Sequence, residues 1–580
     1  MNHKTESREW KVVTLFFLLH VVLTLPILIP NLKDIGAFDE ASYVEMGRTF
    51  GLRSLPPVNQ YPLAGFFFAL TYLPVHSSDF WFVYSCTVGR FLLLVLLWIS
   101  SYTLAKRLSG ISSPLLMIGF LLVSPAAISL TRNASHALFA AMATVALAQL
   151  ISFRREGRLT NLRMASVFLS LALLSRVGEG MLLFGSLIAL SILLGISAGR
   201  VKAALTAAAL PFVVITAGYM LICYVFTGKS PLGTGDYFYT TFEQGHGLAY
   251  ANQFPGSSHY AEGELESRRV FGTPEENKHS VITAIRRNPV AYVKRIPRLA
   301  KEAVSESIGV YGGALSLWLF LLALYGCIEL VRRKDFMLLC ILLFWLSYLV
   351  IYILLVFQPS HLLLPFPVVF CFASIGLTAL ISASGKQRLL ASVVLLGFVV
   401  LAAARNAPLP FIYVALVPLV GLWIVWTVSK WFENSEVMRP AALVFLLSIM
   451  LLFAERVPQQ KLRKPGIAPE EQAMLFLKRN FEEGTAVGAY SPAVPWAAKL
   501  KRVTLVNRRT EVQSEQDLQR WIRDDNLHAI YVDGNLRRYE SSVWTLIEAQ
   551  IGKTMDIAFV SDDPDIEILR IRSSYAPPSR

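Results

Sequence analysis

Long apolar runs dominate the sequence and decide what kind of fold the chain can adopt. They recur from Lys11 to Ala454, and most reach the roughly 17–25 residues that an α-helix needs to cross a bilayer. Only 16% of the 580 residues are charged, whereas a soluble domain carries about a quarter. The sequence therefore excludes a soluble enzyme. It predicts a multi-pass α-helical membrane protein of about 13 transmembrane helices.

Short connectors separate the expected spans. The first run is too long for the apolar part of a cleavable signal, so we interpret it as a span. The fifth is too short to cross alone, so we expect it to be buried in protein or broken. In chain order the spans cover residues 11–30, 81–105, 112–131, 134–153, 164–176, 180–198, 203–226, 312–331, 336–357, 361–382, 388–404, 409–430 and 438–454.

The distribution of positive charge predicts the topology. The net charge is +14, and lysines and arginines gather in alternate connectors, as the positive-inside rule requires of cytoplasmic loops. This pattern argues against nucleic acid as a partner. With a cytoplasmic N-terminus and an odd number of spans, everything after Glu455 lies outside. Loops 31–80 and 227–311 share that outer face with the tail.

Each outer segment carries its own pattern. In the first loop, Tyr43 and Gly47 fall on one face of a short helix that we expect to lie on the membrane. In the second, Asn288 before a proline is typical of a helix start. The histidines of this loop, His246 and His259, lack metal spacing and are expected in solvent.

The spacing of apolar residues in the tail alternates between the repeat of a helix and that of a strand, which indicates a small α/β domain. We therefore divide the chain into a transmembrane domain of residues 1–455 and an extracytoplasmic α/β domain of residues 466–580. The expected helices cover 470–480, 515–523 and 541–549, and the expected strands cover 486–490, 503–506, 529–532 and 566–571.

Two acidic residues, Asp39 and Glu40, follow the first span by about ten residues. A structural interpretation is open: Asp39 caps the helix that follows, and Ser42 with Glu45 has the form of a capping box. A functional interpretation is also open. A carboxylate at the membrane edge can act as a general base toward an acceptor whose reaction partner is anchored in lipid.

Arginines at unexpected depths are the second candidate feature. Arg132 and Arg176 stand at the outer ends of spans, and Arg90 lies inside the second span. Such arginines are costly and tend to face a cavity or an anion, and a guanidinium suits phosphate. Snorkelling to headgroups, or pairing of Arg176 with Glu179, are the structural alternatives. His361, at the start of the tenth span, is a further candidate phosphate ligand.

The segment from Asp39 to Arg48 resembles the acidic first-loop motif of membrane glycosyltransferases of the GT-C fold. That superfamily includes the protein O-mannosyltransferases and the bacterial aminoarabinose transferases. Four further segments resemble elements of the family in the same order along the chain: Gln60 to Leu63, Gly89 to Phe91, Leu173 to Arg176, and His361 to Pro367.

The resemblance implies a reaction and a site. A sugar on a polyprenyl-phosphate carrier would pass to a glycan, lipid or protein acceptor at the outer face, with Asp39 as general base and Glu40 as its support. Nearby cations would stabilise the anionic leaving group. We take these to be Arg132, Arg176, His361 and Arg90.

Some positions depart from the family. Aminoarabinose transferases carry an arginine where Ser42 stands and a lysine where Gln60 stands, so that substrate is not assigned. His136 stands close to where the family often has Pro-Asp. No nucleotide is needed, no cofactor is assigned, and a divalent metal is left open.

A flippase or transporter, a ligase or polymerase of lipid-linked glycans, and an assembly subunit remain alternatives. Neither long outer segment carries a glycosylation sequon, which favours the inner (cytoplasmic) membrane of a bacterium.

Overall fold

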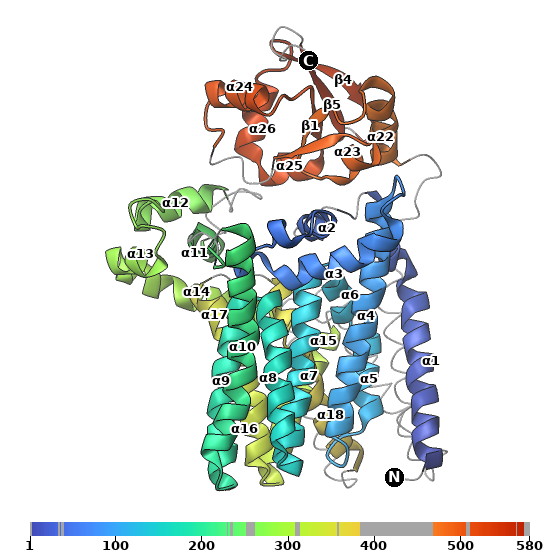
Figure 1. Ribbon diagram of the computed structural model, residues 1–580, viewed down its shortest axis with the longest axis vertical. Helices are drawn as coiled ribbons and strands as arrows, with labels where there is room; N and C mark the ends of the chain where they lie inside the picture. Colours follow the sequence, from blue (N-terminus) through green and yellow to red (C-terminus); the bar gives the residue numbers. More distant parts are fainter. Residues whose placement is uncertain are drawn as a thin grey trace, which may run out of the picture.

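The chain folds into a helical bundle with a small α/β domain at one end (Figure 1). α1 (His3–Leu28) begins at the opposite end of the bundle. The computed structural model describes residues 3–32, 35, 40–228, 230–232, 236–250, 261–307, 314–355, 359–382, 468–505, 511–563 and 565–572. The three spans expected between residues 388 and 454 lie outside these ranges, as does Asp39.

Among the described residues, 5 helices are long and apolar enough to cross a membrane. They confirm a multi-pass membrane protein but not the count of 13. These five are α4 (Trp81–Arg107), α7 (Ala134–Glu156), α9 (Val177–Ser197), α10 (Val201–Thr227) and the segment Phe336–Leu354, which comprises α16 (Phe336–Trp345) and α17 (Leu349–Leu354). The bundle also contains α5 (Pro114–Val123), α6 (Ala126–Thr131), α8 (Leu159–Ser175), α15 (Ala314–Arg332) and α18 (Phe366–Ser382).

Two expected spans differ from the observed helices. The span 112–131 is two helices, because Pro125 has no N–H to continue the helical ladder and α6 starts only after it. The fifth span is longer than expected. α8 (Leu159–Ser175) has 17 residues because its helix already begins at Leu159, in the expected connector between residues 153 and 164.

The first loop forms two helices at the end of the bundle, α2 (Glu40–Arg48) and α3 (Pro62–Tyr72). The expected buried face of α2 is confirmed at Tyr43 and Gly47. A Cβ on Gly47 would lie 2.6 Å from the backbone of Phe68, so only glycine permits this contact with α3. Helix α3 was not expected from the sequence. Single 3₁₀ turns connect these elements: η2 (Leu52–Ser54), η3 (Val58–Gln60) and η4 (Leu73–Val75).

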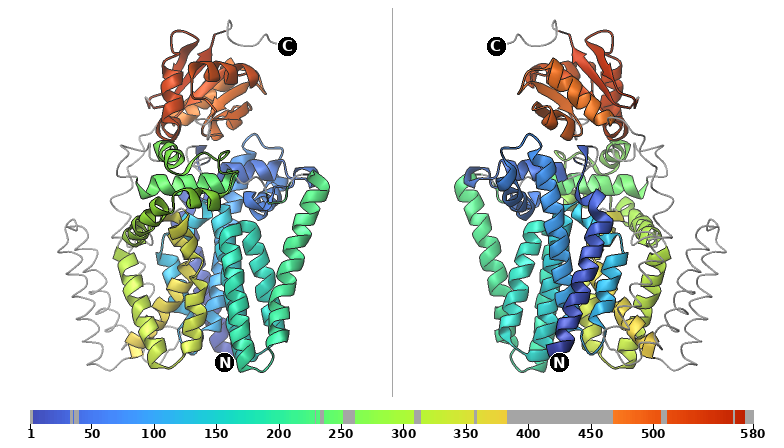
Figure 2. Two further views of the ribbon diagram at one scale, coloured as in Figure 1. Left: turned by 90° about the vertical axis from the view of Figure 1, so that its left-hand side faces the viewer. Right: turned by 90° about the vertical axis from the view of Figure 1, so that its right-hand side faces the viewer.

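The second loop forms a platform of helices between the bundle and the α/β domain (Figure 2). Asn288 accepts a hydrogen bond from the backbone N–H of Ala291, which confirms the expected helix start. The expectation of solvent around His246 was wrong: its side chain is buried, and burial beside Arg295 lowers its pKa to about 4. The platform comprises α11 (Asp236–Ala249), α12 (Ala261–Phe271), α13 (Val281–Arg287) and α14 (Pro289–Ser307).

The tail forms the predicted α/β domain around a five-stranded sheet of order β2-β1-β3-β5-β4. β1 pairs in parallel with β2 and β3, and the β3–β5 and β4–β5 pairs are antiparallel. β4 was missed because its residues do not alternate between buried and exposed. The strands are β1 (Ala486–Ala489), β2 (Lys501–Thr504), β3 (Ala529–Val532), β4 (Met555–Val560) and β5 (Glu567–Ile571). The helices are α22 (Pro469–Asn480), α23 (Ala493–Ala497), α24 (Glu515–Asp524), α25 (Gly534–Tyr539) and α26 (Ser541–Glu548).

Helix α23 docks this domain onto the start of α4. The Trp496 ring lies 5.6 Å from that of Trp81 and 5.7 Å from that of Phe82. At the rim, Lys499 pairs with Asp79, N to O 3.2 Å. The α/β domain therefore covers the end of the bundle that carries α2.

Candidate active site

Glu40 and Arg90 form a buried ion pair that holds the first turn of α2 against α4. Arg90 Nε and Nη2 donate to the two carboxylate oxygens of Glu40 at 2.8 and 2.5 Å. Arg90 Nη1 donates to the backbone oxygen of Ile27 at 2.8 Å. Because buried charges need a partner and satisfied hydrogen bonds, this guanidinium joins the end of α1, the start of α2 and the middle of α4.

Asp39 directly precedes Glu40 in the chain and lies outside the described residues. The capping-box alternative for this segment is excluded, because α2 begins at Glu40 and Ser42 is already inside the helix. Glu45 instead pairs with Arg48 on the exposed side of α2. Glu40, the second residue of the acidic pair, therefore stands in the first turn of α2 and faces inward.

Tyr43 connects α2 to the start of α7. Its hydroxyl donates to Ser135 Oγ at 3.2 Å, and Ser135 Oγ donates to Asn133 Oδ1 at 2.8 Å. Asn133 also accepts from the backbone N–H of His136 at 3.3 Å and thereby caps α7. Asn133 is thus the cap of α7 and is linked through Ser135 to Tyr43 of α2.

Arg176 lies in the junction between α8 and α9, where the backbone is extended. Its guanidinium donates to Glu179, so the expected structural pairing is present. The hydroxyl of Tyr352 donates to the same carboxylate. The guanidinium carbon also lies 5.6 Å from the centre of the Tyr61 ring, which turns one face of Arg176 toward α3.

His361 belongs to the 3₁₀ turn η6 (Pro359–Leu363) and is buried. Its ring stacks on Tyr352 with centroids 4.0 Å apart and meets the His136 ring at 5.8 Å. Both predicted positions, His361 and His136, therefore join the Arg176 cluster, together with Tyr352. Tyr352 was missed, and the only sequence signal for it is that it follows Tyr348 by one helical turn inside an apolar run.

Tyr61 has an unusual backbone conformation. Its φ is 57° and its ψ is 62°, in the left-handed region, directly before Pro62. A residue before proline is normally extended, and side chains other than glycine avoid positive φ. The Tyr61 ring contacts the Tyr43 ring at 6.2 Å. Strain of this kind persists where surrounding contacts enforce it, and it concentrates at functional sites.

Arg132 differs from the other candidate cations. It ends α6 and is exposed, and within the described part of the chain its side chain makes no hydrogen bond or ion pair. The described residues contain no group of three or more His, Cys, Asp or Glu placed to hold a metal. The structure thus brings Arg176, His136 and His361 together, places Arg90 under α2, and leaves Arg132 at the surface.

The sequence matches no family model, and a comparison with curated proteins finds no match. Solved structures do match the fold. ArnT from Cupriavidus metallidurans bound to undecaprenyl phosphate aligns over 97% of this chain and 99% of its own, with TM-score 0.54 and 12% identity. The apo form of that protein aligns with TM-score 0.51, at 11% identity, over 98% of this chain and 99% of its own.

A second protein matches over most of its length as well. The apo oligosaccharyltransferase of Archaeoglobus fulgidus aligns over 92% of this chain and 71% of its own, with TM-score 0.50 and 12% identity. At such identities the likeness is one of fold. The chain therefore has the GT-C fold of these membrane glycosyltransferases.

Proposed function

We propose that the protein is a glycosyltransferase that moves a sugar from a polyprenyl-phosphate carrier to an acceptor at the outer face of the membrane. The acceptor class is a glycan, a lipid or a protein. Two observations support this function: the shared fold, and a matched structure that holds undecaprenyl phosphate. A lipid-borne donor also requires a site at the end of a helical bundle, and α2 lies at such an end (Figure 1).

The fixed start of α2 is the observation that carries the proposal. Glu40, the first residue of α2, is held by Arg90, and Asp39 directly precedes it in the chain. In the reaction Asp39 accepts the proton of the acceptor hydroxyl or amine. The acceptor atom bonds to the anomeric carbon, and the bond from that carbon to the carrier phosphate breaks. The carrier leaves with the electron pair as a polyprenyl phosphate.

The cations divide into two roles in this proposal. Arg90 is a positioning residue, because its guanidinium donors already hold Glu40 and Ile27. Arg132, Arg176 and His361 are the candidate ligands of the donor phosphate. Arg176 brings a guanidinium to the cluster with Tyr61 and His361, and exposed Arg132 is accessible to a lipid headgroup.

The remaining assignments follow from the charge pattern and from this chemistry. The transmembrane glycosyltransferase domain of residues 1–455 would carry the site, and the α/β domain of residues 466–580 would stand outside. The N-terminus would be cytoplasmic and the membrane the bacterial inner membrane. In this arrangement the site and the tail would lie on the same side of the membrane, opposite the basic connectors.

The decisive test is Asp39→Asn in the purified full-length protein, assayed with polyprenyl-phosphate sugars. Asparagine keeps the size of the side chain but cannot accept the proton. We expect transfer to fall by roughly 10²–10⁴-fold, the usual contribution of a general base. The acceptors assayed should span a glycan, a lipid and a peptide.

Glu45→Gln is the matched control, because it removes a carboxylate from the exposed side of the same helix. It should keep transfer near the unaltered level. Full transfer by Asp39→Asn would exclude the assigned base. Movement of lipid-linked sugar across the bilayer without a new glycosidic bond would indicate a flippase instead.

A further inference from the structure

A groove lies between the beginnings of α8 and α10, at the end of the bundle where α1 also begins. Its volume is about 680 Å³, within the range of sites that hold small molecules. It lies at the opposite end of the bundle from α2 (Figure 1). Arg163, Arg200 and Lys202 bring positive charge to the groove, and the rest of its lining is mainly aliphatic.

Pro211 lies at the deep end of the groove. Proline has no N–H and interrupts the hydrogen-bond ladder of α10. Ser166 of α8 enters the ladder at this point: its hydroxyl donates to the Ala208 backbone oxygen at 2.6 Å and accepts from the Phe212 backbone N–H at 2.9 Å. The two helices are therefore joined at Ser166, and the groove extends from this joint toward the beginnings of both helices.

The three cations are not neutralised within the protein. Among the described residues they form no ion pair with a carboxylate. Arg200 Nη2 donates to the Gly157 backbone oxygen at 2.7 Å, which is a neutral acceptor. Glu156 is the one acidic residue in the sequence segments 154–163 and 198–206, and it is held by Arg107 and Arg158 at 3.3 and 3.7 Å. The groove therefore has a surplus of positive charge.

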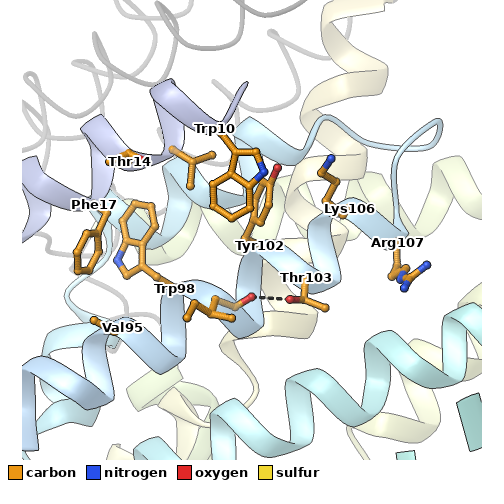
Figure 3. Close-up of a pocket in the computed structure, with 11 residues that line it drawn as sticks. Trp10, Thr14, Phe17, Val95, Trp98, Tyr102, Thr103, Lys106 and Arg107 are labelled. Atoms are coloured by element: carbon orange, nitrogen blue, oxygen red, sulfur yellow. Dashed lines mark hydrogen bonds between the residues drawn. The ribbon is translucent and has the colours of Figure 1, made fainter. Parts of the chain in front are cut away.

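A second groove at the same end of the bundle, between α1 and α4, provides a contrast (Figure 3). Its basic residues, Lys106 and Arg107, lie in the last turn of α4, where the helix dipole disfavours an anion. Arg107 pairs with Glu156, and Tyr102 donates to the buried Glu9 carboxylate at 3.2 Å. α8 and α10 instead begin at their groove, so their dipoles add to its positive charge.

At its deep end the groove continues into surface that faces hydrocarbon. Leu210 lines the groove and lies eight residues beyond Lys202, which is about 12 Å along the axis of α10. Leu210 is 57% exposed, and Val213 and Val214 beyond it are 54% and 59% exposed. Because α10 is apolar enough to span the membrane, these side chains contact lipid. The groove thus offers cations at one end and hydrocarbon at the other.

We propose that this groove binds an anionic phospholipid, with its phosphate at Arg163 and Lys202 and one acyl chain along Leu210 and Pro211. A phospholipid is the ligand class that joins a phosphate to a long hydrocarbon chain. Guanidinium and ammonium groups bind phosphate, and basic pockets between helices on the cytoplasmic side bind anionic headgroups. The connectors that form this groove are among those that the charge pattern predicts to be cytoplasmic.

Native mass spectrometry of the full-length protein tests the site. The purified protein would be titrated with phosphatidylglycerol and, separately, with phosphatidylcholine of the same acyl chains. We expect selective retention of phosphatidylglycerol, because the surplus cations meet no compensating cation in its headgroup. Each basic residue near a membrane surface strengthens anionic-lipid binding roughly fivefold. Arg163→Gln with Lys202→Gln should therefore weaken retention by about 10–30-fold.

Arg332→Gln with Lys334→Gln is the matched control. It removes the same charge from the connector before Asp335, which pairs with Arg154 at the same end of the bundle. This variant should keep the selectivity. An equal loss in both double variants would show that only net charge matters and would overturn the site. Equal retention of the two lipids by the unaltered protein would also overturn it.

Thr206→Trp tests the place of the acyl chain. Thr206 lines the groove and is exposed, so a larger ring there fills the groove and leaves the three cations in place. Retention of phosphatidylglycerol should fall severalfold. Leu221→Trp is the control, because Leu221 is 63% exposed on α10 outside the groove, and it should leave retention unchanged.

Two outcomes of this second test contradict the proposal. Unchanged retention by Thr206→Trp would place the lipid elsewhere. Displacement of phosphatidylglycerol by an equal concentration of inorganic phosphate would show that the groove binds the anion alone and makes no use of the acyl chain.

Discussion

The Glu40–Arg90 pair shows how one buried contact controls a whole segment. Neither residue is more than 2% exposed, and the guanidinium is also bonded to the last part of α1. The energetic value of such a pair lies less in attraction than in the cost of leaving one partner alone. Removal of one partner should therefore be far more damaging than removal of both.

We expect Glu40→Ala to destabilise the protein by about 3–5 kcal/mol, because the buried Arg90 guanidinium then loses the carboxylate that accepts two of its hydrogen bonds. The measurement is the thermal unfolding of the detergent-purified protein. Glu40→Leu with Arg90→Met should unfold at a higher temperature than the single variant.

The exposed pair on the same helix is the control for this prediction. Arg48 and Glu45 are 44% and 34% exposed, so Glu45→Ala should cost no more than about 1 kcal/mol. Equal effects of the Glu40 and Glu45 variants would contradict the positioning role of the buried pair.

At the scale of helices, α15 and α18 pack backbone against backbone. A Cβ on Gly326 would lie 2.0 Å from the carbonyl oxygen of Phe372, and one on Gly376 would lie 2.1 Å from that of Leu322. Small residues permit such approach between helices in lipid, where association depends on close packing. This contact positions α18, which directly follows the turn η6 that carries His361.

Gly326→Ala should therefore force α15 and α18 apart and destabilise the protein by about 1–3 kcal/mol, the usual cost of overpacking. Thermal unfolding measures this loss, and transfer activity should fall with it. Gly185→Ala and Gly218→Ala are controls from α9 and α10, where an added Cβ meets nothing within 4 Å. They should be neutral or slightly stabilising, because alanine favours helix over glycine. A neutral Gly326→Ala would contradict the close packing.

Helices and strands could be predicted from the sequence where the pattern of apolar residues involves only neighbouring positions. The strands around Val487, Ile530 and Leu569 were found because a central strand of the sheet is a short apolar run. The site was predictable only as separate residues. Glu40 and Arg90 are fifty positions apart, and no local pattern shows that they pair. His246 was misplaced because its burial depends on neighbouring helices that fold over it.

At the scale of the molecule, two unlike contacts attach the α/β domain to the bundle. Trp496 packs on Trp81 and Phe82, whereas Lys499 pairs with an Asp79 that is 51% exposed. Aromatic contacts of this size dominate interface energies, and exposed ion pairs contribute little. Arg502 adds a link to α2: burial lowers its pKa to about 10, and the neighbouring Glu45 carboxylate opposes that shift.

Trp496→Ala should loosen the docked domain, and Lys499→Gln should change little. Hydrogen–deuterium exchange of the first turn of α4, at Trp81 and Phe82, reports the difference. We expect exchange there to rise at least several-fold in the tryptophan variant only. A larger rise in the lysine variant would show that the ion pair, and not the aromatic contact, holds the domain.

The three-way contact of Arg90 also constrains biosynthesis. Its partners, Ile27 and Glu40, are synthesised before it. The first turn of α2 therefore lacks its buried ion pair until α4 has emerged from the ribosome. Tyr43 can bond to Ser135, and the Glu179 carboxylate that Arg176 holds can accept from Tyr352, only after Ser135 and Tyr352 have been synthesised. A nascent chain halted between α4 and α17 would hold α2 against α4 through the Glu40–Arg90 pair, but it would lack Tyr352 of the Arg176 cluster. The described contacts of the first loop and of the Arg176 cluster are therefore complete only after α17 has been synthesised.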